Sequence, residues 1–194
     1  MTVRTLVHVG DPVLRAGTRE VSRAELATVE VQGLIDDLVD TMRDANGAGI
    51  AAPQVGSDLR IAIAEVTPQT ANLRYPYKPP IPLTVLVNPR LRSLDDEVVV
   101  VNEGCLSVPG LRGELERHVT IEAAWWDRDG GEHVEVRRGL TAGTFQHEVD
   151  HLDGHVFVDR VTDSTTFMTW DNYQRHHRAA FETRIRKFVE RVGS

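Results

Sequence analysis

The sequence predicts an α+β protein in which antiparallel β-sheets pack around a central helix, with one helix before it and one at the C-terminus. Two observations predict this class: the strand patterns occur in clusters, and the helical patterns stand apart from them instead of alternating as βαβ units. The chain has 194 residues, of which 41% are apolar. This length is enough for one well-packed hydrophobic core and rather short for two. We therefore expect residues 1–194 to form a single domain.

The first helix is predicted from apolar residues at i, i+3, i+4, i+7 spacing, which places them on one face. Those residues are Val31, Leu34, Ile35, Leu38, Val39 and Met42. Asn46 and Gly47 follow, and either is suited to the left-handed conformation that ends a helix.

Short buried strands are predicted at residues 60–66, 83–87 and 98–101, and alternating apolar residues on either side of "DRDGG" predict a hairpin over 119–136. Between the first two strands, the segment Pro68 to Pro82 holds five of the nine prolines. Proline lacks the N–H that a central strand needs, so a stiff surface loop is expected there.

Two further helices are predicted at residues 141–152, with Gly154 just past the end, and at residues 172–192. Residues 172–194 contain six basic residues and two glutamates, although the whole chain has a net charge of −7. This predicts a basic C-terminal helix on an acidic body, which either contacts an acidic partner such as RNA or is simply a solvated helix face.

The sequence has no pattern of a signal peptide and no apolar run approaching a membrane span, so we expect a soluble, intracellular protein with no membrane partner. Cys105 is the only cysteine, which excludes an internal disulfide and fits a reducing compartment. The acidic balance argues against a general nucleic-acid binder, and no sequence-specific nucleic-acid partner is expected.

The segment "FQHEVDHLDG", residues 145–154, contains an HExxH pattern. His147 and His151 lie four residues apart, so one helix face can aim both rings at one metal ion. Glu148 is turned about 100° away, which suits a general base that holds a water better than it suits a ligand.

A metal site needs a third ligand, and several residues are candidates. Phe157 occupies the position where metzincin proteases have their third histidine, and His155 comes two residues too early. A thermolysin-like protease would use a downstream glutamate, Glu182 or Glu190. Cys105 is the better candidate, because it lies in "EGCLSVPG", where a valine-rich strand runs into a glycine turn. A Cys-His-His set with an open fourth position is the layout of a catalytic site.

A third segment, "GAGIAAPQVG" at residues 47–56, follows a helix and has no strand before it, so it is not a nucleotide-binding loop. Its small residues allow a substrate to approach the backbone, and Gln54 offers a neutral hydrogen-bond donor.

Together these segments resemble the motifs of the peptide deformylase family, with "GAGIAAPQ", "EGCLS" and "HEVDH" in the family's order. The similarity extends to "GDPVLR" and "DTMRDANG" and covers roughly residues 6–161. It implies a hydrolase that removes the formyl group from N-formylmethionyl nascent chains, releasing formate, in the bacterial cytoplasm.

The resemblance implies that Cys105, His147 and His151 bind one divalent ion, with Fe²⁺ expected and Zn²⁺, Ni²⁺ or Co²⁺ able to substitute. Glu148 would be the general base and acid, and Gln54 and the backbone N–H of Leu106 would bind the developing oxyanion. The expected substrate-binding residues are Gly47, Gly49, Ile50, Gly104, Arg112, Leu140, Gly143 and Thr144. The residues expected to orient ligands or substrate are Glu103, Arg112, Arg117 and Asp150.

Two alternatives stay open on the residues alone. One is an HExxH zinc endopeptidase, and the other is a catalytically inactive, ribosome-associated relative. In either case the basic helix at 172–194 predicts a transient, salt-sensitive contact with the ribosome.

Overall fold

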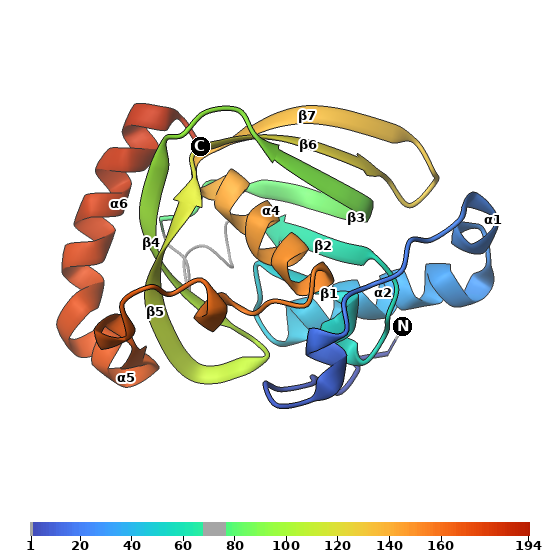
Figure 1. Ribbon diagram of the computed structural model, residues 1–194, viewed down its shortest axis with the longest axis horizontal. Helices are drawn as coiled ribbons and strands as arrows, with labels where there is room; N and C mark the ends of the chain where they lie inside the picture. The colour runs from blue at the N-terminus through green and yellow to red at the C-terminus, as the bar shows by residue number, and fades with distance from the viewer. Residues whose placement is uncertain (1, 68–76) are drawn as a thin grey trace.

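Helix α4 lies between two antiparallel sheets, and helix α6 runs along the outer side of the smaller one (Figure 1). This is a computed structural model, and it describes residues 2–67 and 77–194. The α+β prediction is confirmed. Within the described residues, no helix is both long and apolar enough to cross a membrane.

The helices are α1 (Arg23–Leu26), α2 (Val29–Asp44), α4 (Gly139–Leu152), α5 (Trp170–Asn172) and α6 (Arg178–Val192). The strands are β1 (Gly49–Ala51), β2 (Ile61–Val66), β3 (Ile81–Ser93), β4 (Val98–Cys105), β5 (Val108–His118), β6 (Thr120–Trp126), β7 (Glu132–Arg138) and β8 (Met168–Thr169). Short 3₁₀ turns cover Pro12–Arg15, Ala52–Val55, Phe157–Asp159 and Ser164–Thr166.

The five-stranded sheet has the order β1-β2-β3-β6-β7, and the three-stranded sheet has the order β4-β5-β8. Every neighbouring pair is antiparallel. The register of β4 and β5 shifts between Gly104 and Cys105. Such a bulge re-aims the side chain at the strand end, and here that side chain is the Cys105 thiol.

The predicted strands are all present, but two are longer than expected. The predicted 83–87 strand lies in the first half of β3, and the predicted 98–101 strand is the first half of β4. Residues 81 and 82 belong to β3, so the loop prediction over Pro68 to Pro82 is wrong at its end; proline is tolerated near the start of a strand. The rest of that prediction lies mostly at residues 68–76, outside the described residues.

The predicted first helix is α2, with the Thr28 side chain accepting a hydrogen bond from Val31 N at its start. Asn46 supplies the left-handed residue after it, with φ of 55°. The predicted single helix over 172–192 needs correction, because a π-helical turn at Tyr173–His177 separates α5 from α6.

Helix α4 is held by its apolar side. Ala142, Phe145 and Leu152 are buried in a cluster with β2, β3 and β6. Gly154, with φ of 80°, follows the helix, and its position leaves no room for a Cβ beside the Arg15 carbonyl. The helix is therefore fixed along its length, which fixes the direction of the side chains on its other side.

Candidate metal centre

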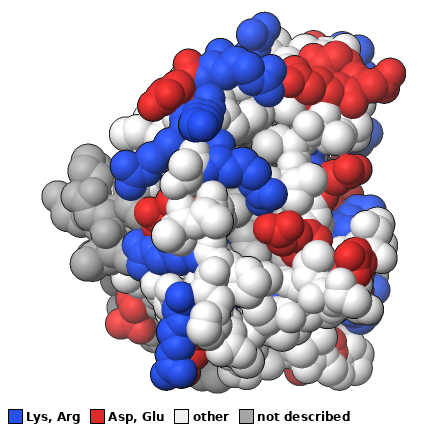
Figure 2. All heavy atoms as spheres, turned by 90° about the vertical axis from the view of Figure 1, so that its left-hand side faces the viewer, with Lys and Arg blue, Asp and Glu red and all other residues white. Residues whose placement is uncertain are grey.

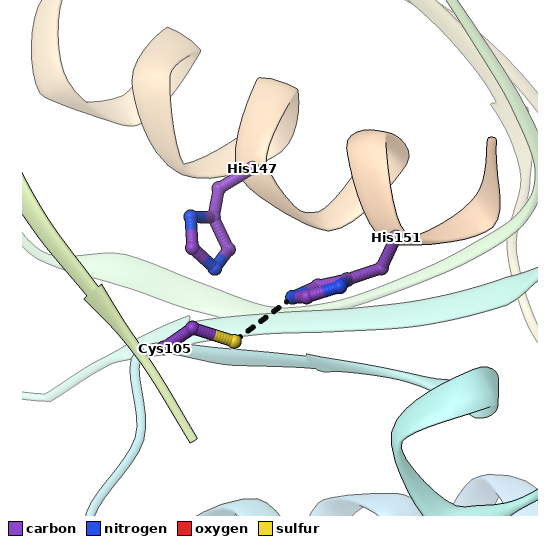
Figure 3. A group of neighbouring side chains, drawn as sticks. All are labelled: Cys105, His147 and His151. Carbon is purple, nitrogen blue, oxygen red and sulfur yellow. Dashed lines mark hydrogen bonds between the residues drawn. The ribbon is translucent and has the colours of Figure 1, made fainter. Parts of the chain in front are cut away.

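Three side chains from two elements converge between α4 and the end of β4. Cys105 comes from the strand end, while His147 and His151 come from successive turns of the helix, and all three point toward one another (Figure 3). Their ligand atoms lie within 4.8 Å of one another, and Cys105 Sγ lies 3.1 Å from His151 Nε2. This spacing allows one ion to contact all three.

The chemistry of these donors also fits a metal ion. Burial opposes ionisation of the Cys105 thiol, but His151 and His147 outweigh it and bring the pKa of the thiol down to about 5. A thiolate with two imidazoles is a donor set suited to zinc, iron, cobalt and nickel. Three protein ligands also leave a coordination position open, as in catalytic sites.

A chain of ion pairs orients the first of the two histidines. Glu103 Oε2 lies 2.8 Å from His147 Nδ1 and accepts a hydrogen bond from it, so Nε2 is the ring nitrogen left to face the cluster. Arg117 donates to both oxygens of Glu103 at 2.9 Å and to Asp150 at 2.6 Å. Asp150 in turn accepts from Arg160. The structure thus joins the predicted orienting residues Glu103, Arg117 and Asp150 in one buried network.

The Glu148 carboxyl lies in the same pocket as the cluster and is only 3% exposed. Among the described residues, none offers a hydrogen bond to its Oε2. Burial raises the pKa of this carboxyl to about 7. A Cβ on Gly49 would lie 2.1 Å from Glu148 Oε1, so the carboxyl group leaves no room for a side chain at position 49.

Gln54 is held as a donor directed at the cluster. Its Oε1 accepts from Ala51 N at 2.9 Å, which fixes the amide so that Nε2 faces Cys105 Sγ at 3.4 Å. Nε2 also donates to Ser107 Oγ at 3.1 Å, and Ser107 N lies 3.3 Å from Cys105 Sγ. The sequence analysis missed Ser107, although it is the last residue of "EGCLS".

A cavity of about 70 Å³ opens beside the cluster. Of the predicted substrate-binding residues and oxyanion donors, those that line it are Gly47, Gly49, Gln54, Gly104, Leu106, Arg112, Leu140, Gly143 and Thr144. The sequence analysis missed further lining residues, namely Ala48, Tyr77, Lys78, Val101, Asn102 and Phe181. No local motif marks the last group, because distant segments bring them to the cavity. Ile50, also predicted, is fully buried and does not line it.

Arg112 is only 2% exposed and connects the cavity to the C-terminal segment. It donates to the Asn102 side chain at 2.5 Å and to the Asn102 carbonyl at 2.6 Å. Its guanidinium lies over the rings of Trp170 and Tyr173. Arg112 therefore uses much of its hydrogen-bonding capacity on Asn102, another residue of the cavity wall.

The C-terminal segment gathers Lys and Arg side chains on one face, as Figure 2 shows. Several of them are paired with acids, which reduces the charge that a partner would meet. The pairs are Arg178–Glu182, Arg186–Glu182, Arg184–Glu114 and Arg191–Glu97.

Comparison with known proteins shows which family the chain is similar to. The model of the polypeptide deformylase family matches residues 3–167. Peptide deformylase 2 of Nostoc sp. is 41% identical over 169 residues, spanning 87% of this chain and 92% of that protein. Peptide deformylase of Leptospira biflexa is 40% identical over 167 residues, spanning 86% and 92% respectively.

Solved structures give the same result. A class I type b peptide deformylase from Acinetobacter baumannii with Met-Ala-Ser bound superposes with a TM-score of 0.78 and 37% identity, covering 82% of this chain and 99% of that one. Peptide deformylase from Thermotoga maritima gives 0.72 and 31%, covering 84% and 100%. The endopeptidase and inactive-relative alternatives find no support in these comparisons.

Proposed function

The chain belongs to the polypeptide deformylase family, and we propose a role for each of its site residues in the reaction of that family. Members of the family are metal-dependent hydrolases that remove the formyl group from N-terminal formylmethionine. The observation that carries the proposal is the convergence of Cys105, His147 and His151 beside a buried carboxylate, Glu148. We further propose that residues 1–194 act as a single catalytic domain.

The proposed ligands are Cys105, His147 and His151, and the expected ion is Fe²⁺, with Zn²⁺, Ni²⁺ or Co²⁺ able to substitute. When bound, such an ion supplies Lewis acidity, which makes a water easier to ionise and polarises a carbonyl. Glu103 supports the ligand set by fixing the His147 tautomer. Arg117 holds Glu103 in place.

Glu148 is the proposed general base and then the general acid. Its carboxylate takes a proton from the attacking water as the oxygen of that water bonds to the formyl carbon. It returns the proton to the amine nitrogen as the carbon–nitrogen bond breaks. The products are formate and a chain with a free N-terminus.

Gln54 Nε2 and the backbone N–H of Leu106 are the proposed oxyanion donors. The Gln54 amide is fixed by its bond from Ala51 N, so it needs little reorganisation during the reaction. Losing one such donor in other hydrolases lowers kcat by roughly 10²- to 10³-fold.

The peptide substrate is proposed to lie along the outer edge of β1. This strand is at the end of the five-stranded order, and an extended peptide can add to such an edge through backbone hydrogen bonds at Gly49 and Ile50. The first side chain then enters the cavity lined by Leu140, Gly143 and Thr144. The Met-Ala-Ser in the Acinetobacter relative supports a peptide that begins with methionine.

Formate release from formyl-Met-Ala-Ser tests the assignment. Protein stripped of metal under anaerobic conditions should be inactive and should regain activity with Fe²⁺, while Cys105→Ser should bind the ion weakly. Gln54→Leu should keep the ion but lose roughly 10²- to 10³-fold in kcat. Full activity of Cys105→Ser without bound metal would contradict the ligand assignment.

A transient ribosome contact through residues 172–194 is also proposed, motivated by the basic face of that segment. We place the reaction in the bacterial cytoplasm, where formylated chains are made. Co-sedimentation with ribosomes should weaken as salt rises and should fall when exposed arginines such as Arg175 and Arg186 are changed to glutamine. Unchanged co-sedimentation of that variant would contradict the contact.

A further inference from the structure

Lysine is rare in this chain, which has only Lys78 and Lys187 among its 22 basic residues. Lys187 is exposed on α6. Lys78 is instead partly buried in the wall of the cavity beside the proposed metal ligands. The chain uses arginine for nearly all of its other basic positions, so a lysine in the reaction cavity calls for a chemical explanation.

The position of Lys78 is defined by helix α4. Its Nζ donates to Thr144 Oγ1 at 2.8 Å, and that hydroxyl donates to the Leu140 carbonyl at 3.0 Å. Thr144 and Leu140 both line the cavity, and Gly143 between them has no side chain to fill it. The wall that would meet the end of a substrate side chain therefore contains an ammonium group and a hydroxyl.

The charges around Lys78 act on its ammonium in both directions. Burial lowers its pKa to about 8, the carboxyls of Glu103 and Glu148 raise it, and Arg112 and Arg117 lower it. An ammonium donates hydrogen bonds and accepts none.

We propose that Lys78 is a specificity-determining residue, whose ammonium favours a first substrate side chain of methionine length that ends in a hydrogen-bond acceptor. This inference rests on the proposed function, which places the first side chain in this cavity. The ammonium adds selection for a hydrogen-bond acceptor at the end of the first side chain, beyond selection for its length and apolar character.

Three side chains of similar length separate this idea from simple apolar recognition. Norleucine has no acceptor, methionine has a weakly accepting thioether sulfur, and methionine sulfoxide has a strongly accepting oxygen. A charge-assisted hydrogen bond favours the acceptor by about tenfold or more. The chain should thus process formylated chains whose first methionine is oxidised.

The test measures kcat/KM for formate release from three peptides, formyl-norleucine-Ala-Ser, formyl-Met-Ala-Ser and formyl-methionine-sulfoxide-Ala-Ser. In the metal-loaded wild-type protein, the sulfoxide peptide should exceed the norleucine peptide by about tenfold. Equal or inverted preference in the wild type would overturn the inference without any variant being needed.

Lys78→Met removes the ammonium and keeps an unbranched stem, so it should abolish that preference. Arg90→Met, which removes an exposed cation on β3, is the matched control and should keep it. A merely structural role for Lys78 would lower all three rates in parallel and leave their ratio unchanged, which would also overturn the inference. No formate from any peptide would instead contradict the proposed function.

Discussion

The two sides of helix α4 differ in polarity and in what they contact. The side that faces the five-stranded sheet is apolar, with Ala142, Phe145 and Leu152 buried against β2, β3 and β6. The side that faces the three-stranded sheet carries His147 and His151. Burial of apolar area stabilises the first interface, whereas the second buries polar groups that are costly unless they are paired.

On the polar side, a network of buried ion pairs offsets part of this cost. Arg117 is 5% exposed and bridges Glu103 and Asp150, so these two carboxylates share one partner of opposite sign. Opposite faces of one helix thus supply packing stability and the residues of the candidate site. Substitutions should therefore separate the two properties, except in the network that joins them.

The largest expected effect is on activity alone. Glu148→Gln removes the proton acceptor but keeps the shape of the side chain, and it should lower kcat for formate release by about 10³-fold. Metal content and the midpoint of urea unfolding should stay near those of the wild type. A variant that retains a tenth of the wild-type kcat would show that another group moves the proton.

Arg117→Met should affect both properties. It leaves Glu103 and Asp150 buried without their shared cation, which should destabilise the fold by about 3–5 kcal/mol. The proposed ligand His147 also loses its fixed orientation, so metal affinity should fall by about 10- to 100-fold. Urea unfolding and competition with a metal chelator measure the two effects, and a loss below about 1 kcal/mol would reduce the network to ordinary surface ion pairs.

Leu38→Ala should affect stability alone. Leu38 is fully buried between α2 and the five-stranded sheet, and the cavity left by truncation should destabilise the fold by about 3 kcal/mol. The kcat/KM of the folded protein should not change. Val29→Ala, at a position on the same helix that is 84% exposed, is the control; a drop in kcat/KM for Leu38→Ala would break the separation.

The smallest expected effect lies far from both faces of α4. Ser22 and Glu25 form a capping box at the start of α1, in which Ser22 Oγ accepts from Glu25 N. Ser22→Ala should cost about 1 kcal/mol of unfolding free energy and should not alter formate release. A change in activity here would mean that α1 is coupled to the metal centre.

The position of α2 was predictable because its apolar spacing alone defines it. Strand β5 was not predicted, since its buried positions include two arginines, Arg112 and Arg117. Such arginines are buried only because partners distant in the sequence neutralise or stack on them. Local patterns do not contain that information.

The proposed ligand residues could be picked out because each lies in a local motif, and the structure brings their side chains together. Lys78 could not be predicted as a cavity residue, since its contact with Thr144 joins segments 66 residues apart. The requirement for glycine at position 49 was only partly foreseen. The sequence predicted close approach of a substrate, and the structure adds the carboxylate of Glu148.

The most direct test of the account is a titration of metal-free protein with Ni²⁺, with formate release from formyl-Met-Ala-Ser measured at each step. If Cys105, His147 and His151 hold one catalytic ion, activity should rise in proportion to bound metal and saturate at one ion per chain, and Cys105→Ser should gain none over the same range. Formate release by the metal-free protein, or equal activation of Cys105→Ser, would contradict it.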